Sequence, residues 1–253
     1  MAVFAMTGGA TGIGAAIRDR IQARGDRMIV ADIRDAEVVA DLGTAEGRRA
    51  AVAGIRAAAP EGLDGFVACA GLGPNVDPPS RVARVNYFGA VEVIEGLRDA
   101  LAARAASVVV ISSNSAPMSA DAAFVDLLLA GDEEGAAVHV DKCDGQVAYA
   151  GSKMGVARWV RGNAPAWAKE GVRLNAVAPG IVNTALSTGV AADQRYGAAM
   201  QAFAATVPVG YIGEPCDVAA AVDFLLGAES RFVCGSILFV DGGHDALLRP
   251  AQF

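Results

Sequence analysis

Histidine and clustered cysteine are scarce in this sequence. It contains two histidines, His139 and His244, and four cysteines spread from Cys69 to Cys234 with no Cys-x-x-Cys pair. Structural zinc sites and Ser-His-Asp triads need these residues in defined sets, so we expect neither a metal site nor a triad. Dispersed cysteines are typical of free thiols in a reducing compartment, and we expect a cytoplasmic protein.

Positive charge and long apolar runs are also limited. The chain carries 21 Lys and Arg residues against 28 Asp and Glu residues, which leaves a net charge of −7. An acidic surface suits neither nucleic acids nor anionic membranes. No apolar run is long enough to span a bilayer, and no basic leader precedes the apolar segment that begins at Ala2. We therefore expect a small-molecule ligand, with no nucleic-acid or membrane partner.

Apolar residues are abundant, at 53% of the chain, and many lie in short continuous runs that alternate with segments of helical periodicity. The runs predict strands at residues 3–6, 27–31, 37–40, 65–70, 107–111, 172–178 and 236–240. The periodic segments predict helices from just after Gly14 to about residue 24 and at residues 45–58, 81–104, 149–170 and 214–226. This alternation predicts an α/β fold, a doubly wound Rossmann domain with a mostly seven-stranded parallel sheet and helices on both faces. We expect one domain over residues 1–253, because no repeat or linker divides the chain.

Two segments depart from the alternation. Residues 116–146 form an insertion with two predicted short helices, at residues 121–130 and 132–140, on either side of Gly131. Residues 181–209 carry many apolar side chains, and their charged residues are Asp193 and Arg195. We expect this second segment to be a lid over a binding site.

A glycine-rich loop, Thr7-Gly8-x3-Gly12-x-Gly14, joins the first predicted strand to the first predicted helix. Glycines at such a junction allow a tight turn and close approach of the backbone to a pyrophosphate, which then faces the helix N-terminus. Asp32 follows the second strand, where a carboxylate accepts hydrogen bonds from the adenosine ribose and repels a 2′-phosphate. The loop therefore predicts NAD, although Arg34 could instead reach the phosphate of NADP.

Tyr149 and Lys153 lie four residues apart in a predicted helix, so their side chains share one face. An ammonium beside a phenol is expected to lower the phenol's pKa, as a general acid/base for alcohol and carbonyl chemistry requires. Spacing of this kind also occurs by chance on solvated helix faces. The pair indicates an active site because the same chain also carries the glycine loop.

Taken together, these motifs resemble the short-chain dehydrogenase/reductase family over nearly the whole chain. The shared motifs, in family order, are the glycine loop, Cys69-Ala70-Gly71, Asn86-Tyr87-Phe88-Gly89, Ser113, Tyr149-x3-Lys153 and Ala178-Pro179-Gly180. A closer likeness, to the bacterial hydroxysteroid dehydrogenase/carbonyl reductase group, rests on Asp32-Ile33-Arg34-Asp35, Cys69 to Pro74, Arg195-Tyr196-Gly197 and the tail Arg249 to Phe253.

The resemblance implies a role for each catalytic candidate. Tyr149 would exchange a proton with the substrate oxygen, and Ser113 would hydrogen-bond that oxygen. Lys153 would lower the pKa of Tyr149 and hold the nicotinamide ribose. Asn86 would bend its helix around a water that links Lys153 to solvent. From the residues alone, the Ser112 hydroxyl is an equally good candidate for this hydrogen bond. Ser113 is chosen by its place in the motif.

The resemblance also implies a set of NAD contacts. In it, Asp41 and Leu42 contact the adenine and Thr184 holds the carboxamide. The full set is Gly8, Thr11, Gly12, Ile13, Gly14, Asp32, Asp41, Leu42, Ala70, Gly71, Tyr149, Lys153, Pro179, Gly180, Val182 and Thr184. Cys69 stands where this family usually has asparagine, and with no activating cation evident we expect it to pack rather than react.

The lid composition predicts an apolar carbonyl or alcohol as substrate. A steroid-like substrate is the first hypothesis, and a small hydrophobic ketone is the second. Two alternatives stay open: that the apolar side chains pack the lid's own core, and that the chain is a non-catalytic dinucleotide-binding regulator. The apolar set is Ile181, Val182, Leu186, Val190, Tyr196, Met200, Phe203 and Val207.

Relatives of this kind are usually homodimers or homotetramers, and many pair through the helix that carries the tyrosine. We expect the insertion at residues 116–146 to cover that helix, which favours a dimer through residues 214–240. Pro165 falls within the same helix and predicts a lost hydrogen bond and a kink in its far half.

Overall fold

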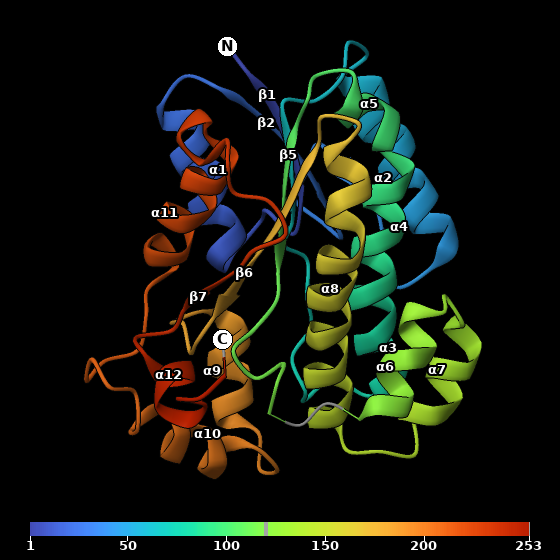
Figure 1. Cartoon of the computed structure of the whole chain (residues 1–253). Helices are drawn as coiled ribbons and strands as arrows, with labels where there is room; N and C mark the ends of the chain where they lie inside the picture. Colours follow the sequence, from blue (N-terminus) through green and yellow to red (C-terminus); the bar gives the residue numbers. More distant parts are fainter. Residues whose placement is uncertain (119–120, 253) are drawn as a thin grey trace.

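The computed structural model describes residues 1–118 and 121–252, and it is built around one parallel sheet (Figure 1). The strands are β1 (Val3–Thr7), β2 (Arg27–Asp32), β3 (Val38–Val39), β4 (Gly65–Ala68), β5 (Ser107–Ile111), β6 (Arg173–Pro179) and β7 (Ile237–Val240). Their order across the sheet is β3-β2-β1-β4-β5-β6-β7, and every neighbouring pair is parallel. The predicted seven-stranded, doubly wound α/β fold is confirmed.

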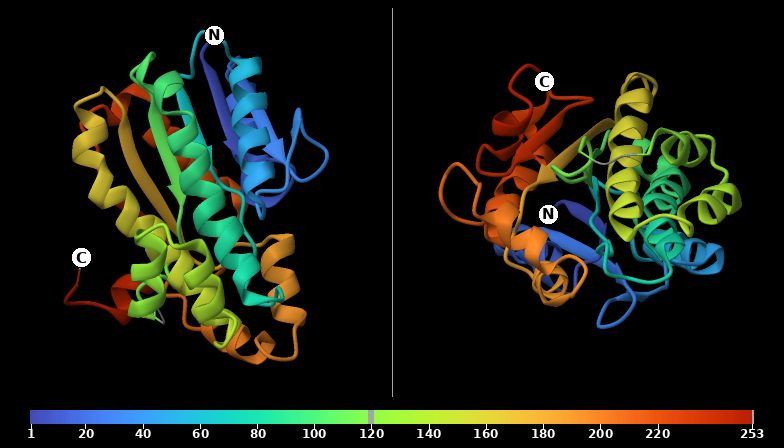
Figure 2. Two further views of the ribbon diagram at one scale, coloured as in Figure 1. Left: turned by 90° about the vertical axis from the view of Figure 1, so that its right-hand side faces the viewer. Right: turned by 90° about the horizontal axis from the view of Figure 1, so that it is seen from below.

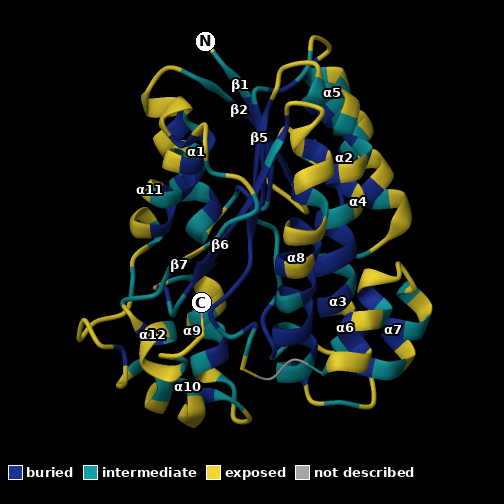
Figure 3. Ribbon diagram, viewed as in Figure 1, coloured by how far each residue is buried: buried dark blue, intermediate teal, exposed yellow. Residues whose placement is uncertain are grey.

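Helices cover both faces of the sheet (Figures 1 and 2). Helices α1 (Gly12–Ala23) and α11 (Pro215–Leu226) pack on one face, where Ile17 and Val222 join the apolar core. On the other face lie α2 (Ala45–Ala58), α4 (Gly89–Gly96), α5 (Arg98–Ala102) and α8 (Gly145–Ala168). The five inner strands of the sheet are almost completely buried, whereas the edge strands β3 and β7 are partly exposed (Figure 3). Burial on both faces explains why the strand sequences are continuously apolar.

The helix predicted over residues 81–104 is present, but a π-helical turn and one non-helical residue, Leu97, divide it into several pieces. They are α3 (Pro79–Ala83), a π-helical turn (Arg84–Phe88), α4 and α5. Asn86 lies in the π-helical turn, and its side-chain amide is bound to both backbone groups of Leu72. Long-range hydrogen bonds of this kind hold the wider turn, which helical periodicity alone does not reveal.

The insertion forms the two expected short helices, α6 (Ala122–Leu129) and α7 (Glu133–Val140), and they pack beside α3 and α8 (Figure 1). Glycines on α8 make the contact close. A Cβ atom at Gly151 would lie 2.5 Å from the ring of Phe124, and one at Gly155 would lie 3.1 Å from Leu128. The insertion therefore covers part of the face that α8 turns away from the sheet.

Three further helices gather beyond the carboxyl ends of β6 and β7, at the lower left of Figure 1. They are α9 (Ala185–Ala192), α10 (Gly197–Ala204) and α12 (His244–Leu248); a 3-10 turn (Ala228–Ser230) precedes β7. Helix α8 continues past Pro165 to Ala168 as one element. None of the helices in the described ranges combines the length and apolar character needed to cross a membrane.

Candidate active site

One cleft of about 630 Å³ opens at the carboxyl ends of the strands. Ser113 and all sixteen residues predicted to contact NAD line this cleft. Of the predicted site residues, Asn86 alone lies behind the wall, where it is 2% exposed. The convergence follows from the parallel sheet, because the glycine loop, Asp32, Ala70, Ser113 and Pro179 all lie at or just beyond strand ends.

The glycine loop is held tightly between β1 and α1. Gly8 and Gly12 have φ angles of +73° and +56°, which side chains rarely tolerate. A Cβ atom at Gly14 would lie 1.8 Å from the carbonyl oxygen of Gly8, and one at Gly8 would lie 2.5 Å from Ala70. The loop thus brings bare backbone and the first turn of α1 to the cleft wall, an arrangement that suits phosphate groups.

Asp32 and Arg34, the two residues that bear on cofactor choice, are separated by the fold. Asp32 lines the cleft, and its Oδ2 accepts a hydrogen bond of 3.0 Å from the backbone N–H of Ala10. The Arg34 side chain is 80% exposed, is not among the residues that line the cleft, and lies 4.0 Å from Asp35. A carboxylate rather than a guanidinium therefore faces the expected position of the adenosine ribose.

Tyr149 and Lys153 project from α8 into the same part of the cleft, and the ammonium lies 6.0 Å from the centre of the phenol ring. The pKa of Tyr149 is raised, mainly by burial, while a hydrogen bond from Ser113 opposes the rise. The net shift is therefore upward, opposite in direction to the lowering expected from the sequence. Burial also lowers the pKa of Lys153 to about 8, which weakens its positive charge above neutral pH.

The two serines after β5 have different partners. Ser112 is buried and donates a hydrogen bond of 2.8 Å to the backbone oxygen of Lys153, which holds α8 against β5. The Ser113 hydroxyl lies 2.9 Å from the Ser115 hydroxyl and accepts a longer hydrogen bond from the Ser115 N–H. Because the Ser112 hydroxyl is engaged by the backbone of Lys153 while the Ser113 hydroxyl lowers the pKa of Tyr149, Ser113 is the better candidate for the hydroxyl at the reacting centre.

Behind the wall, Asn86 joins the π-helical turn to two other segments. Its Oδ1 accepts the N–H of Leu72 at 2.8 Å, and its amide donates to the Ser152 hydroxyl at 3.3 Å. Lys153 donates through Nζ to the carbonyl oxygen of Ile111 at 2.8 Å. Both side chains lie close to Gly71, since a Cβ there would be 3.4 Å from Asn86 Oδ1 and 3.5 Å from Lys153 Nζ.

Cys69 also lines the cleft, with Lys153 as a charged neighbour that the sequence does not reveal. The ammonium lowers the pKa of the thiol, but burial outweighs it and raises the pKa to about 12. The thiol stays protonated at neutral pH, and a protonated thiol is a poor nucleophile. The expectation that Cys69 packs rather than reacts is consistent with this environment.

Helices α9 and α10, which lie in the segment predicted as a lid, contribute side chains to the cleft wall. All of the apolar lid residues named from the sequence line the cleft except Val207, which packs against Gly242. Arg195 pairs with both Asp193 and Asp77 and so ties the lid to the loop after β4. The apolar side chains of the lid thus face a ligand space rather than packing only against each other.

Several cleft residues are missed by the sequence analysis. Arg81, Ser115, Met118 and Gln146 all line the cleft. Gln146 lies three residues before Tyr149, so helical spacing could have identified it. Met118 and Gln146 come from the two ends of the insertion, which therefore contributes to the cleft as well as covering α8.

Comparison with known proteins gives full-length matches. The chain is 42% identical to the 3-alpha-hydroxysteroid dehydrogenase/carbonyl reductase of Comamonas testosteroni, over 100% of both chains. It is 33% identical to the cis-4-hydroxycyclohexanecarboxylate dehydrogenase of Sinomonas cyclohexanicum, over 97% of both. The crystal structure of the 3-alpha-hydroxysteroid dehydrogenase from Pseudomonas sp. B-0831 complexed with NADH has a TM-score of 0.96 and 42% identity, over 99% of this chain and 100% of that one.

A family model described as enoyl-(acyl carrier protein) reductase matches residues 135–245, which include α8 with Tyr149 and Lys153. The full-length relatives extend the match to the glycine loop and the rest of the sheet. The chain therefore belongs to the short-chain dehydrogenase/reductase family.

Proposed function

We propose that this protein is an NAD(H)-dependent oxidoreductase that interconverts a secondary alcohol and a ketone on an apolar, steroid-like substrate. One observation carries the proposal: Ser113, Tyr149 and Lys153 share a single cleft with the glycine loop and an apolar lid. Full-length relatives with dehydrogenase names, one of them crystallised with NADH, support it.

The residues in the cleft fit a dinucleotide. Bare backbone at Gly8 and Gly12 and the first turn of α1 would face the pyrophosphate, while Asp32 would accept hydrogen bonds from the adenosine ribose. Thr11, Ile13, Asp41, Leu42, Ala70, Gly71, Pro179, Gly180, Val182 and Thr184 would complete the contacts. Bound NAD(H) supplies the hydride chemistry, and the protein positions and polarises the substrate.

Tyr149 would exchange the proton. In ketone reduction its hydroxyl donates a proton to the substrate oxygen, and in alcohol oxidation its phenolate removes one. Ser113 would donate a hydrogen bond to the same oxygen and stabilise the negative charge that develops there. Its orientation is assisted by Ser115, whose N–H donates to Ser113 Oγ.

Lys153 and Asn86 would support this proton transfer. The Lys153 ammonium would hold the nicotinamide ribose and stabilise the phenolate of Tyr149, since a nearby positive charge favours an anion. Asn86 would connect Lys153 to solvent through a water beside Gly71, which lies close to both side chains. Thr184 would reach the carboxamide while its Oγ1 accepts the N–H of Ser187 and so caps α9.

The substrate class follows from the lid and from the relatives. The apolar lid residues that line the cleft would bind a rigid hydrocarbon skeleton by burying its surface, at about 25 cal/mol per Å² of apolar area. Hydroxysteroid dehydrogenases among the relatives favour a steroid-like substrate. A small cyclic ketone is the second candidate, because one full-length relative is a hydroxycyclohexanecarboxylate dehydrogenase.

Steady-state kinetics with a panel of hydroxysteroids, cyclohexanols and their ketones will test this proposal. We expect the highest kcat/KM for a hydroxysteroid with NAD, and a marked preference for NAD over NADP because Asp32 would repel the 2′-phosphate. The steroid assignment fails if small cyclohexanols react faster than every steroid. The proposal of an apolar substrate fails if sugars or acyl-carrier thioesters are the best substrates.

We further propose that two copies of the chain pair through α11 and β7. Phe232, just before β7, is fully exposed, and Phe224 and Leu238 on α11 and β7 are 45% and 37% exposed. Large exposed apolar side chains within this one segment of the chain favour burial against a second copy. The insertion covers part of the α8 face, so pairing through α8 is disfavoured.

A Phe232→Glu variant is expected to convert this dimer to a monomer, because the new carboxylate would have to be buried in the interface. Sedimentation equilibrium measures the change, and we expect at least a tenfold weaker association, from about 1.4 kcal/mol of lost binding free energy. Val138→Glu, on the exposed surface of α7, is the matched control and should leave assembly unchanged. The reverse pattern would place the interface on the insertion.

A cytoplasmic location completes the proposal. All four cysteines are free, and Cys216 and Cys234 are exposed. Exposed free thiols persist in a reducing compartment, which favours the cytoplasm.

A further inference from the structure

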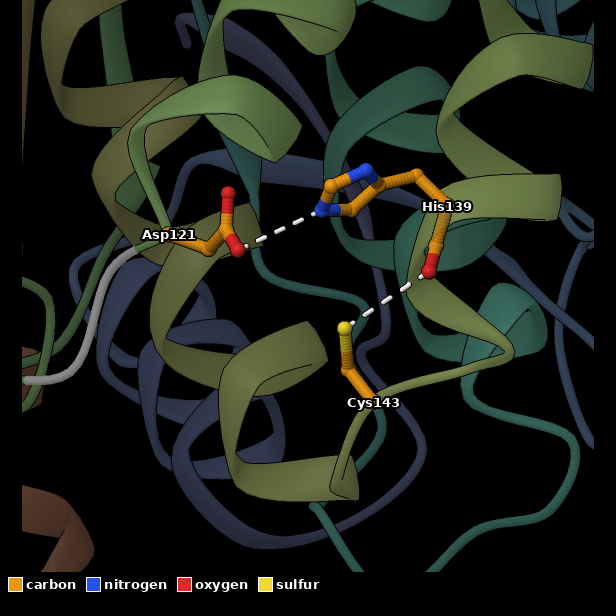
Figure 4. Close-up of side chains that lie close together, drawn as sticks. All are labelled: Asp121, His139 and Cys143. Carbon is orange, nitrogen blue, oxygen red and sulfur yellow. Dashed lines mark hydrogen bonds and ion pairs between the residues drawn. The ribbon is translucent and has the colours of Figure 1, made fainter.

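Three side chains with metal-binding atoms meet in the insertion, outside the cleft (Figure 4). They are Asp121, at the start of α6, and His139 and Cys143, at the end of α7 and just beyond it. One ligand atom from each lies within 4.8 Å of the others. The sequence analysis expects no metal site, yet the spacing His139-x3-Cys143 is one helical turn and brings both residues to one side.

We propose that Asp121, His139 and Cys143 form a binding site for Zn²⁺, separate from the dehydrogenase cleft. The donor set of one imidazole nitrogen, one thiolate and one carboxylate oxygen is typical of zinc, with a fourth position left for water. The site would join the first turn of α6 to the end of α7 and so hold the insertion together.

The ion-pair distance between Asp121 and His139 is also the distance expected between two ligands of one ion. His139 Nε2 lies 3.3 Å from Asp121 Oδ2, yet this buried nitrogen has no hydrogen-bond partner among the described residues. Two ligand atoms bonded to a tetrahedral zinc ion at about 2.0–2.1 Å would be roughly 3.3 Å apart. The observed separation already matches that value, so neither side chain has to move.

Both side chains are fixed by contacts that leave the ligand atoms available. Asp121 Oδ1 accepts the N–H of Phe124 at 2.9 Å and caps α6, while Oδ2 faces the imidazole. The His139 ring stacks on Phe124, with the planes 7° apart. Two of the three proposed ligands, Asp121 and His139, are therefore already held in place.

Cys143 needs a small adjustment. Its thiol contacts the carbonyl oxygen of His139 at 3.6 Å, whereas a zinc-bound sulfur would lie roughly 3.6 Å from the ligating nitrogen and oxygen atoms. Because the three ligand atoms already lie within 4.8 Å of one another, Sγ would have to move closer by at most about 1.2 Å. Binding converts the thiol to a thiolate, forms one Zn–S bond and releases one proton to solvent, with no change of oxidation state.

Zinc titration of the untagged protein, stripped with EDTA and followed by calorimetry, tests the site. We expect one Zn²⁺ per chain, and Co²⁺ in its place should show a thiolate charge-transfer band and tetrahedral d–d bands. Asp121→Asn, His139→Gln and Cys143→Ser should each weaken Zn²⁺ binding at least tenfold, since even outer-shell changes can do so. Cys216→Ser and Cys234→Ser, at exposed thiols elsewhere, are the matched controls and should bind as the parent does.

Thermal unfolding gives an independent measurement. Zn²⁺ should raise the melting temperature of the parent chain and leave that of Cys143→Ser unchanged, because a ligand that binds only the folded state stabilises it. The proposal is overturned if the parent binds no Zn²⁺, or if binding persists at full strength in both His139→Gln and Cys143→Ser. Neither result would affect the proposed dehydrogenase activity, because that activity uses a different part of the chain.

Discussion

Replacing Tyr149 with phenylalanine is expected to lower kcat for both alcohol oxidation and ketone reduction by about 10²–10⁴-fold, the usual contribution of a general acid/base. The variant keeps the ring that packs in the cleft and removes only the hydroxyl that would exchange the proton. Binding of NADH should stay within a few-fold of the parent, as measured by fluorescence titration. Tyr211→Phe, at a side chain that is 67% exposed and outside the cleft, is the matched control and should be fully active.

The same variant separates an enzyme from a dinucleotide-binding regulator. A regulator would have no turnover to lose, so equal and very low rates in Tyr149→Phe and the parent would contradict the proposed function. Retention of more than a tenth of the parent's kcat would show that another group transfers the proton. Ser115→Ala should have a smaller effect, because Ser115 touches Ser113 rather than the reacting oxygen.

The raised pKa of Tyr149 also predicts how the rates of reduction and oxidation depend on pH. The phenol is protonated at neutral pH, which suits donation to a ketone. Oxidation of an alcohol needs the phenolate, so kcat/KM for oxidation should rise about tenfold per pH unit below the pKa of Tyr149. In Tyr149→Phe the remaining activity should lose this slope, which a merely structural role for the ring would not explain.

The fold could be predicted from the sequence because its sheet is parallel. Strands such as Ser107–Ile111 are buried on both faces, so their sequences are continuously apolar and bounded by turns. The break in the helix that follows β4 could not be predicted, because it depends on hydrogen bonds between Asn86 and Leu72, distant in sequence. The lid helices α9 and α10 are short and were not distinguished from loop, although Thr184 and Ser187 form a capping box at the start of α9.

The part of the candidate site that lies at strand ends could be predicted, because the carboxyl ends of parallel strands meet at one edge of the sheet. Gly8, Asp32 and Ser113 follow different strands, and a parallel sheet brings them to one edge. The pKa of Tyr149 was not predictable, because the spacing to Lys153 gives the charge but not the burial that outweighs it. Gln146 and Met118 were missed for a related reason, since the path of the insertion past the cleft is a tertiary property.

Lys153→Met is expected to remove activity and to stabilise the folded protein. The Lys153 side chain is 5% exposed, and burial lowers its pKa from 10.5 to about 8. At about 1.36 kcal/mol per pKa unit, holding the ammonium in the cleft costs about 3 kcal/mol of stability at pH 7. Methionine fills the same volume without a charge but loses the hydrogen bond to Ile111, worth about 1 kcal/mol. We expect a net gain of about 1–2 kcal/mol in the free energy of unfolding at pH 7.

The stability gained by Lys153→Met should decrease as the pH rises. Between the folded pKa of about 8 and the unfolded value of 10.5, the unfolded parent chain binds more protons than the folded one, so the parent becomes more stable as pH rises. The advantage of Lys153→Met is therefore largest below pH 8 and should shrink toward pH 10. Urea unfolding of both proteins from pH 7 to 9.5 measures it, with Lys169→Met, at an exposed lysine, as the control that stays within about 0.5 kcal/mol. If Lys153→Met were less stable than the parent at pH 7, the ammonium would be stabilised by its surroundings, and the lowered pKa would be wrong.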